Sequence, residues 1–257
     1  MKRLLFIALG LLVTGAAVAA VLMIGAQRAR RAQTELAKAA ERGDAAAVRS
    51  LVARGEDVNA RDEGFTPLAF AARAGDAETV NALLDAKADP NQRDCRNGWT
   101  PLIHAVHTHQ RDAARALIMR GADVNARSGG CHDESAESGM TPLMFAAMYD
   151  DAELVKLLLE RGADPRAEYD GDNALTHAVG GAALGKLADI DRAATQPCPT
   201  ETVRLLLAKA PDLSVGGGAL DSATNYIIRK KCPEVAALLD GRRPSPPPSP
   251  SQIGESR

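Results

Sequence analysis

Residues 66–91, TPLAFAARAGDAETVNALLDAKADPN, decide the fold of this 257-residue chain. Thr66 can cap a helix through its hydroxyl, and Pro67 suits the first helical position, where no backbone N–H is needed. Gly75 can end that helix, and Asp76 can cap a second one. The apolar residues of each predicted helix share one face: Leu68, Ala71 and Ala72 in the first, and Val80, Leu83 and Leu84 in the second. The segment therefore predicts two short helices joined by a tight turn.

The same module recurs along the chain. Thr-Pro-Leu opens it again at Thr100 and Thr141, and weaker copies begin at positions 34, 173 and 218. This pattern resembles the ankyrin repeat, whose period is about 33 residues. The resemblance implies an all-α repeat solenoid of five to six repeats over residues 34–240, each repeat a helix pair with a finger loop. Two longer intervals between starts predict insertions at residues 128–139 and about 180–199.

The N-terminal segment predicts a membrane association. Residues 4–26 carry no charge and are flanked by basic residues on both sides. A helix of this length would span about 34 Å, enough for a hydrocarbon core of about 30 Å. We interpret residues 1–27 as a retained transmembrane anchor or a signal segment, and residues 28–33 as a basic linker. The alternative to an anchor is a signal peptide cleaved near Ala17-Val18-Ala19, although its apolar region would be longer than usual.

The cysteines and the flanking charges give opposite indications of membrane orientation. The C-terminal flank of the apolar segment is slightly more basic, which favours repeats in the cytoplasm. The four cysteines, however, lie outside the repeat core positions, and an even number of loop cysteines is typical of an oxidising compartment. We predict the disulfides Cys95–Cys131 and Cys198–Cys232, each joining neighbouring repeats. We therefore expect an anchor in a bacterial inner membrane with repeats facing the periplasm, or a soluble periplasmic chain after signal cleavage.

Composition limits the remaining possibilities. The formal charge is −2 and the pI is about 6.2, which gives no electrostatic case for a nucleic-acid partner. Residues 241–257 are rich in Pro and Ser, and this composition predicts a disordered tail.

We find no sequence pattern that predicts an enzyme, and expect no catalytic site, cofactor or bound metal. His104 and His107 are three residues apart and could share a helix face, but a third strong metal ligand is not near them in sequence. His177 belongs to a repeat two further along. A metal- or haem-handling protein that uses these three histidines is the alternative reading.

The ankyrin resemblance implies a non-enzymatic module that binds a protein partner on a concave face. In that family the fifth and eighth positions, counted from the Thr of Thr-Pro-Leu, point to this face. The residues at these positions are Phe70 and Arg73, His104 and His107, Phe145 and Met148, His177, and in the first repeat Lys38 and Glu41. Aromatic residues, Met and Arg are enriched in interface cores. An adaptor or immunity-type role would use such a surface. The insertion at 180–199 could instead fold over this face and cover Phe145.

A second set of large apolar residues stands directly before the Thr of each Thr-Pro-Leu tripeptide. Phe65, Trp99 and Met140 occupy this place, and we expect them to pack between finger loops as structural residues.

Overall fold

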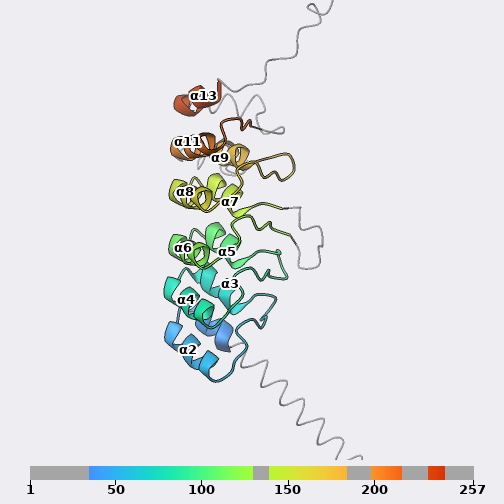
Figure 1. Cartoon of the computed structure of the whole chain (residues 1–257), viewed down its shortest axis with the longest axis vertical. Coiled ribbons are helices and arrows are strands. Elements are labelled where there is room, and N and C mark those ends of the chain that lie inside the picture. The colour runs from blue at the N-terminus through green and yellow to red at the C-terminus, as the bar shows by residue number, and fades with distance from the viewer. Residues whose placement is uncertain (1–34, 130–138, 184–197, 216–230, 241–257) are drawn as a thin grey trace, which may run out of the picture.

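The chain forms a stack of helix pairs (Figure 1). The computed structural model describes residues 35–129, 139–183, 198–215 and 231–240. Its helices after a first helical segment at residues 35–41 are α2 (Ala45–Ala53), α3 (Pro67–Ala74), α4 (Ala77–Asp85), α5 (Pro101–His107), α6 (Arg111–Met119), α7 (Pro142–Met148), α8 (Ala152–Glu160), α9 (Ala174–Ala183), α11 (Thr200–Lys209) and α13 (Pro233–Asp240). In the described part of the chain the only β-pairings are two isolated bridges. The predicted all-α repeat solenoid is confirmed.

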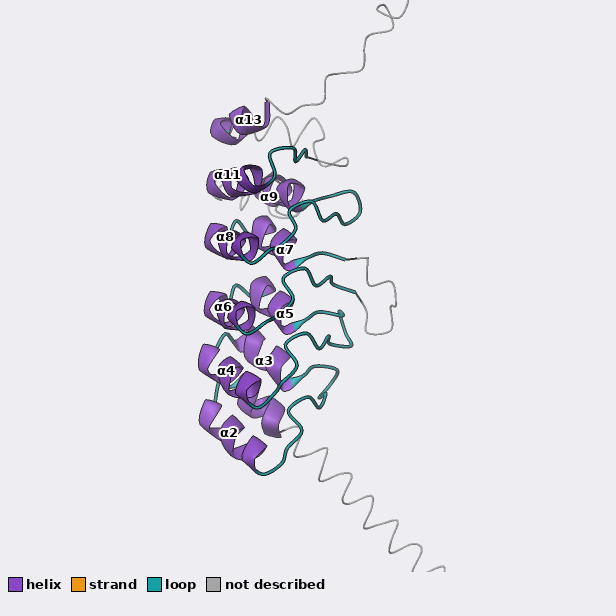
Figure 2. Cartoon of the chain, viewed as in Figure 1, coloured by secondary structure: helices purple, strands orange, loops and turns teal. Residues whose placement is uncertain are grey.

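The helices form two layers. The inner helices α3, α5, α7 and α9 pack on one another, and so do the outer helices α2, α4, α6, α8, α11 and α13. The connecting loops project from one side of this stack (Figure 2). Among the described helices, the main contacts of each repeat are with its neighbours, as in other solenoids.

The Thr-Pro-Leu tripeptide starts three inner helices in the same way. The hydroxyl oxygens of Thr66, Thr100 and Thr141 accept hydrogen bonds from the backbone N–H groups three residues later, at 3.1, 3.4 and 3.3 Å. The proline follows at the first turn of each helix. The predicted caps are confirmed.

Leucine side chains fill the centre of each interface between repeats. The leucine of each inner-helix start is almost fully buried, at Leu68, Leu102, Leu143 and Leu175. The outer helices contribute a second buried set: Leu83, Leu117, Leu158 and Leu206. Because a lone repeat would leave both sets exposed, stacking supplies most of the stabilisation.

The turn between inner and outer helices needs a left-handed residue. Gly75 ends α3 with φ 86°, and Asp76 then caps α4 through its side chain. The third and fourth repeats place His109 (φ 59°) and Asp150 (φ 53°) there instead. Asp and His tolerate this conformation better than most side chains, so the turn survives without glycine.

Asparagine side chains connect successive loops. The Oδ1 atoms of Asn59, Asn91 and Asn125 each accept a hydrogen bond from the backbone N–H of an Asp in the next repeat, at 2.8 Å in all three cases. Asn125 also donates through Nδ2 to the Gly162 carbonyl at 3.1 Å. These hydrogen bonds connect successive repeats through their loops, in addition to the packing of the helices.

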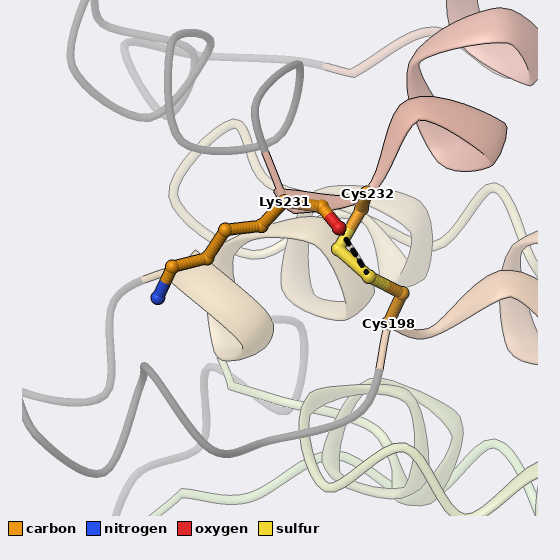
Figure 3. The surroundings of a disulfide bond; sticks show 3 residues. All are labelled: Cys198, Lys231 and Cys232. Carbon is orange, nitrogen blue, oxygen red and sulfur yellow. Dashed lines mark hydrogen bonds between the residues drawn. A yellow bond between two sulfur atoms is a disulfide. The ribbon is translucent and has the colours of Figure 1, made fainter.

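The C-terminal repeats use other connections. Arg166 occupies the turn position at which the earlier repeats have an asparagine. Its side chain forms an ion pair with Asp212. A disulfide joins Cys198, just before α11, to Cys232, just before α13, with the two Cα atoms 5.5 Å apart (Figure 3). The predicted Cys198–Cys232 pairing is confirmed.

The other predicted pairing, Cys95–Cys131, is not formed. Cys95 is an exposed free thiol, and Cys131 lies outside the described residues. The backbone N–H of Cys95 donates to the Gly64 carbonyl at 2.9 Å, and the Cys95 Cβ lies close to Gly64. Cys95 is thus held against the preceding finger loop, whereas Cys131 belongs to the following one.

The described residues on either side of the first insertion are hydrogen-bonded to each other. The backbone N–H of Ser128 donates to the Met140 carbonyl at 3.0 Å, and the Met140 N–H donates to the Ser128 hydroxyl at 2.8 Å. The second insertion separates α9 from α11 as expected, but α9 runs on to Ala183, so the insertion begins later than residue 180.

Several predictions concern residues outside the described part. These are the segments 1–27 and 28–33, the middle of both insertions, the start of the last repeat at 218, and the tail 241–257. Among the helices that the structure does describe, none has the length and apolar character needed to cross a bilayer.

Candidate protein-binding surface

A continuous row of rings crosses the inner helices of the second, third and fourth repeats. We call it the aromatic ladder; its members are Phe65, Phe70, Trp99, His104, His107, His109, Phe145 and Tyr149. Neighbouring ring centroids lie between 4.5 and 5.9 Å apart, mostly tilted or edge to face. Only eight Phe, Tyr and Trp residues occur in the chain (four, three and one), and five of them are here. A chain so poor in aromatic residues has concentrated them on one surface.

One side of the ladder is buried. Phe65, His104 and Phe145 are 6%, 3% and 5% exposed. The expectation that His104 and Phe145 stand open on the partner-binding face is therefore wrong. The reason is Trp99, which comes from the loop before α5 and packs against both rings, at 5.3 and 5.5 Å. Phe145 is thus covered by Trp99 of the preceding repeat.

His104 is part of a buried network of hydrogen bonds. Its Nε2 lies 2.6 Å from Oδ2 of Asp94, which is fully buried. Asp94 also accepts hydrogen bonds from the backbone N–H groups of Arg96, Asn97 and Trp99. Burial acts to raise the pKa of Asp94, but the bonds from His104 and the backbone outweigh it and hold the pKa below its usual value. The network fixes the loop that places Trp99.

The other side of the ladder remains accessible. Phe70, Trp99, Met148 and Tyr149 are half-buried, while Arg73 and His107 are exposed. We call these six residues the exposed edge of the ladder. The guanidinium groups of Arg73 and Arg96 lie 5.3 and 5.2 Å from the centre of the Phe65 ring. These cation–π contacts hold Arg73 beside the rings.

A hydrogen bond links two members of the exposed edge. The Tyr149 hydroxyl lies 2.6 Å from Nδ1 of His107. Burial lowers the pKa of His107, and the charges of His104, His109 and Arg73 lower it further. Burial also raises the pKa of Tyr149. Both shifts favour a phenol that donates to a neutral imidazole, which leaves the His107 proton on Nε2.

Two sequence models of a known family match this chain. A model described as "Ankyrin repeats (3 copies)" matches residues 18–94 and 36–128, and one described as "Ankyrin repeat" matches residues 138–168. The chain belongs to the ankyrin repeat family. A comparison with curated proteins gave no match. Ankyrin repeats indicate a protein–protein interaction module, and such proteins are typically non-enzymatic.

The other predicted surface residues lie apart from the ladder. In the first ankyrin repeat Lys38 and Glu41 are exposed, and Lys38 pairs with Glu35 at 3.5 Å. His177 is half-buried on α9, and its Nε2 is buried without a hydrogen-bond partner among the described residues. Burial lowers the pKa of His177, while Asp172 acts in the opposite direction. This histidine does not extend the exposed edge.

The histidines of this ankyrin chain do not converge on one point. Nε2 of His104 is hydrogen-bonded to the Asp94 carboxylate, and Nδ1 of His107 is hydrogen-bonded to the Tyr149 hydroxyl. Across the residues that the structure describes, no three His, Cys, Asp or Glu side chains are grouped so as to hold a metal ion. The geometry therefore favours a packing role for His104 over the metal- or haem-handling alternative.

Two residues of the exposed edge were not predicted from sequence. The sequence predicts a structural role for Trp99. It packs against the core, as Met140 does, and Phe65 is buried, but Trp99 also faces His107. Tyr149 follows the eighth position by one residue, so the positional pattern of the repeat does not include it. The chain contains three tyrosines, and this rarity is the sequence feature that could have drawn attention to Tyr149.

Proposed function

We propose that this chain is a non-enzymatic ankyrin module that holds a protein partner on the exposed edge of the aromatic ladder. The observation that carries the proposal is the ladder itself, which spans three repeats and leaves Trp99, Tyr149 and Arg73 accessible. Trp, Tyr and Arg are the residue types that dominate interface hot spots. Side chains that already pack against one another lose little conformational freedom on binding, so the surface is preorganised.

The proposal includes a membrane tether and an oxidising compartment. The uncharged residues 4–26 would anchor the chain, and the repeats would face the periplasm, with an adaptor or immunity-type role there. The Cys198–Cys232 disulfide supports this part, because such bonds persist in exported proteins and are rare in a reducing cytosol.

Site-specific photo-crosslinking in cells of the source organism tests the surface. A photoreactive amino acid replaces Arg73 or His107 on the exposed edge, and Glu78 or Lys156 on exposed positions of the outer helices α4 and α8 serve as controls. We expect one discrete protein adduct from the edge positions and none from the controls. Adducts from the outer helices alone would place the partner on the opposite layer.

A reporter fusion tests the tether and its orientation. Alkaline phosphatase, which is active only after export, is joined after Arg31. We expect an active reporter in the membrane fraction. An inactive phosphatase together with an active cytoplasmic reporter at the same site would contradict the orientation, while activity in the soluble fraction would mean a cleaved signal.

A further inference from the structure

The exposed edge offers hydrogen-bond donors without matching acceptors. The Arg73 guanidinium lies 5.3 Å from the centre of the Phe65 ring, and no residue in the described part of the chain forms an ion pair with it. The Trp99 indole N–H and Nε2 of His107 also have no acceptor among the described residues. Since the Tyr149 hydroxyl donates to Nδ1 of His107, three donor groups remain unused beside accessible rings.

The carboxylates of the same loops and of the preceding repeat do not neutralise Arg73. Asp94 is fully buried and already hydrogen-bonded. Glu63 pairs with Arg96, at 3.5 Å. Glu41 holds the equivalent position in the first repeat, but it is exposed and forms no ion pair with Arg73. The charge of Arg73 is therefore available to a partner.

The surroundings of His107 indicate a positive potential along this edge. Burial lowers the pKa of His107 most, and the charges of His104, His109 and Arg73 lower it further. A positive potential over accessible rings attracts the carboxylates of a partner and repels its basic side chains.

The donors are spaced for an extended segment. Arg73 and His107 occupy the same position on the consecutive inner helices α3 and α5, so they lie about 8–10 Å apart, the usual spacing of packed helices. An extended chain advances about 3.3 Å per residue. A segment with a carboxylate at Arg73 therefore brings a backbone carbonyl to His107 about three residues away, and the side chains between them meet Phe70 and Trp99.

We propose that the partner contributes an extended protein segment that places an aspartate or glutamate side chain on Arg73 and an apolar side chain on the rings of Phe70 and Trp99. The inference rests on the proposed function and names the chemistry of the segment that this surface holds. Arginine suits this role because its planar guanidinium can donate two parallel hydrogen bonds to one carboxylate. The ring contact with Phe65 already holds Arg73 in place, which reduces the entropy lost on binding.

Selection from a random peptide library tests the chemistry without knowledge of the partner. The full-length chain in mild detergent is the target, and the displayed peptides lack tryptophan and a free terminal carboxylate. Trp99 is the only tryptophan of the chain, so a change in its fluorescence identifies peptides that bind at the ladder. We expect these peptides to share an Asp or Glu with an apolar residue within about three positions. A selection without acidic peptides of this kind would overturn the inference.

A double-mutant cycle then tests whether the carboxylate meets Arg73. It combines Arg73→Gln with a peptide in which the acidic residue is replaced by its amide. We expect Arg73→Gln to weaken the acidic peptide about tenfold and the amide peptide hardly at all, with melting unchanged. Arg115→Gln is the matched control, because Arg115 is exposed on the outer helix α6 and has no ion pair among the described residues. It removes the same charge and should leave the binding of both peptides as in the wild type.

Three further results would overturn the inference. Uncharged or basic peptides that alter Trp99 fluorescence as strongly as acidic ones would show that the edge binds segments of another chemistry. Equal losses from Arg73→Gln and Arg115→Gln would reduce the effect to net charge. Additive losses from Arg73→Gln and the amide peptide would mean that the carboxylate binds elsewhere. None of these results contradicts the proposed function, which fails when crosslinks form from the outer helices alone.

Discussion

The second to fourth repeats and the C-terminal repeats of this chain are stacked by different means. In the first group, Thr caps, asparagine bonds between loops and the aromatic ladder recur at every step. In the second group, the inner helix starts at Asn173 without Thr-Pro, an exposed Arg166–Asp212 ion pair replaces the asparagine bond, and a disulfide joins the last two outer helices. Where the Thr-Pro starts and the asparagine bonds end, a covalent link joins the last two described repeats.

This contrast has a thermodynamic meaning. In a solenoid, stability is close to a sum of repeat and interface contributions, so a weak end can unfold while the centre stays folded. The disulfide limits this fraying because it constrains the unfolded ends. The proposed binding surface lies in the second to fourth repeats, where ring contacts and a hydrogen bond hold its side chains in place.

The largest effect should come from equivalent core leucines in the two groups. Leu158 on α8 and Leu206 on α11 are both fully buried. We expect Leu158→Ala to lower the free energy of unfolding of the main transition by about 2–5 kcal/mol, the usual result of a buried cavity. Leu206→Ala should mainly accelerate local opening of the C-terminal repeats. Thermal melting and hydrogen exchange on both variants measure this, and identical effects on the main transition would mean that the two groups unfold as one unit.

The next effect concerns the disulfide. Cys198→Ser with Cys232→Ser removes a cross-link over 34 residues, and we expect a loss of about 2–4 kcal/mol in the chain-entropy model. Hydrogen exchange should show the loss in α11 and α13, with protection in α3 and α5 unchanged. Cys95→Ser is the matched control, because this thiol is free and exposed, and it should leave exchange as in the wild type. Uniform loss of protection along the chain would contradict a local role.

A smaller effect is expected at the loop connections. Asn125→Ala removes two hydrogen bonds to the next repeat and Asn91→Ala removes one, so we expect losses of about 1–2 and about 1 kcal/mol. Arg166→Ala should cost less than either, since its pair with Asp212 is solvent-exposed and screened. Chemical denaturation ranks the three variants. If Arg166→Ala proves the most destabilising, the contrast between the two groups is wrong.

The smallest effect is a pH dependence in the C-terminal group. The folded-state pKa of His177 lies below its ordinary 6.5, so on acidification the unfolded chain takes up this proton first. The contribution of His177 to stability is therefore largest above pH 6.5 and declines as the pH falls toward the folded-state pKa. His177→Gln should flatten the decrease of melting temperature between about pH 7 and pH 5, the range in which histidine titrates. A slope as steep as that of the wild type would show that another group is responsible.

The fold could be predicted from the sequence because the patterns that determine it are local. Thr-Pro-Leu, the small residues of the inner helices and the spacing of Leu83 and Leu84 each lie within one repeat, and repetition made them unmistakable. The Cys198–Cys232 pair could be predicted for a related reason, since both cysteines precede an outer helix in adjacent repeats.

The site could be predicted less well from the sequence, because the burial of its side chains depends on neighbouring repeats. His104 and Phe145 occupy positions that are open in a single helix pair, and only the loop held by Asp94 brings Trp99 over them. The helical spacing of positions five and eight contains no information about this loop. Cys95 is a free thiol, and its backbone N–H donates to the Gly64 carbonyl of the preceding loop, a contact that cysteine spacing does not predict.

The most direct test of the account pairs affinity with melting temperature for two ladder phenylalanines, using the partner recovered by crosslinking. Phe70 on the exposed edge and buried Phe145 are both replaced by Ala. Phe70→Ala should weaken binding by about 2 kcal/mol, roughly thirtyfold, with little change in melting. Phe145→Ala should lower stability by about 3–5 kcal/mol, because it leaves a cavity beneath Trp99. A Phe70→Ala variant that melts early and binds its partner normally would contradict the claim that the exposed edge of the ladder is the binding surface.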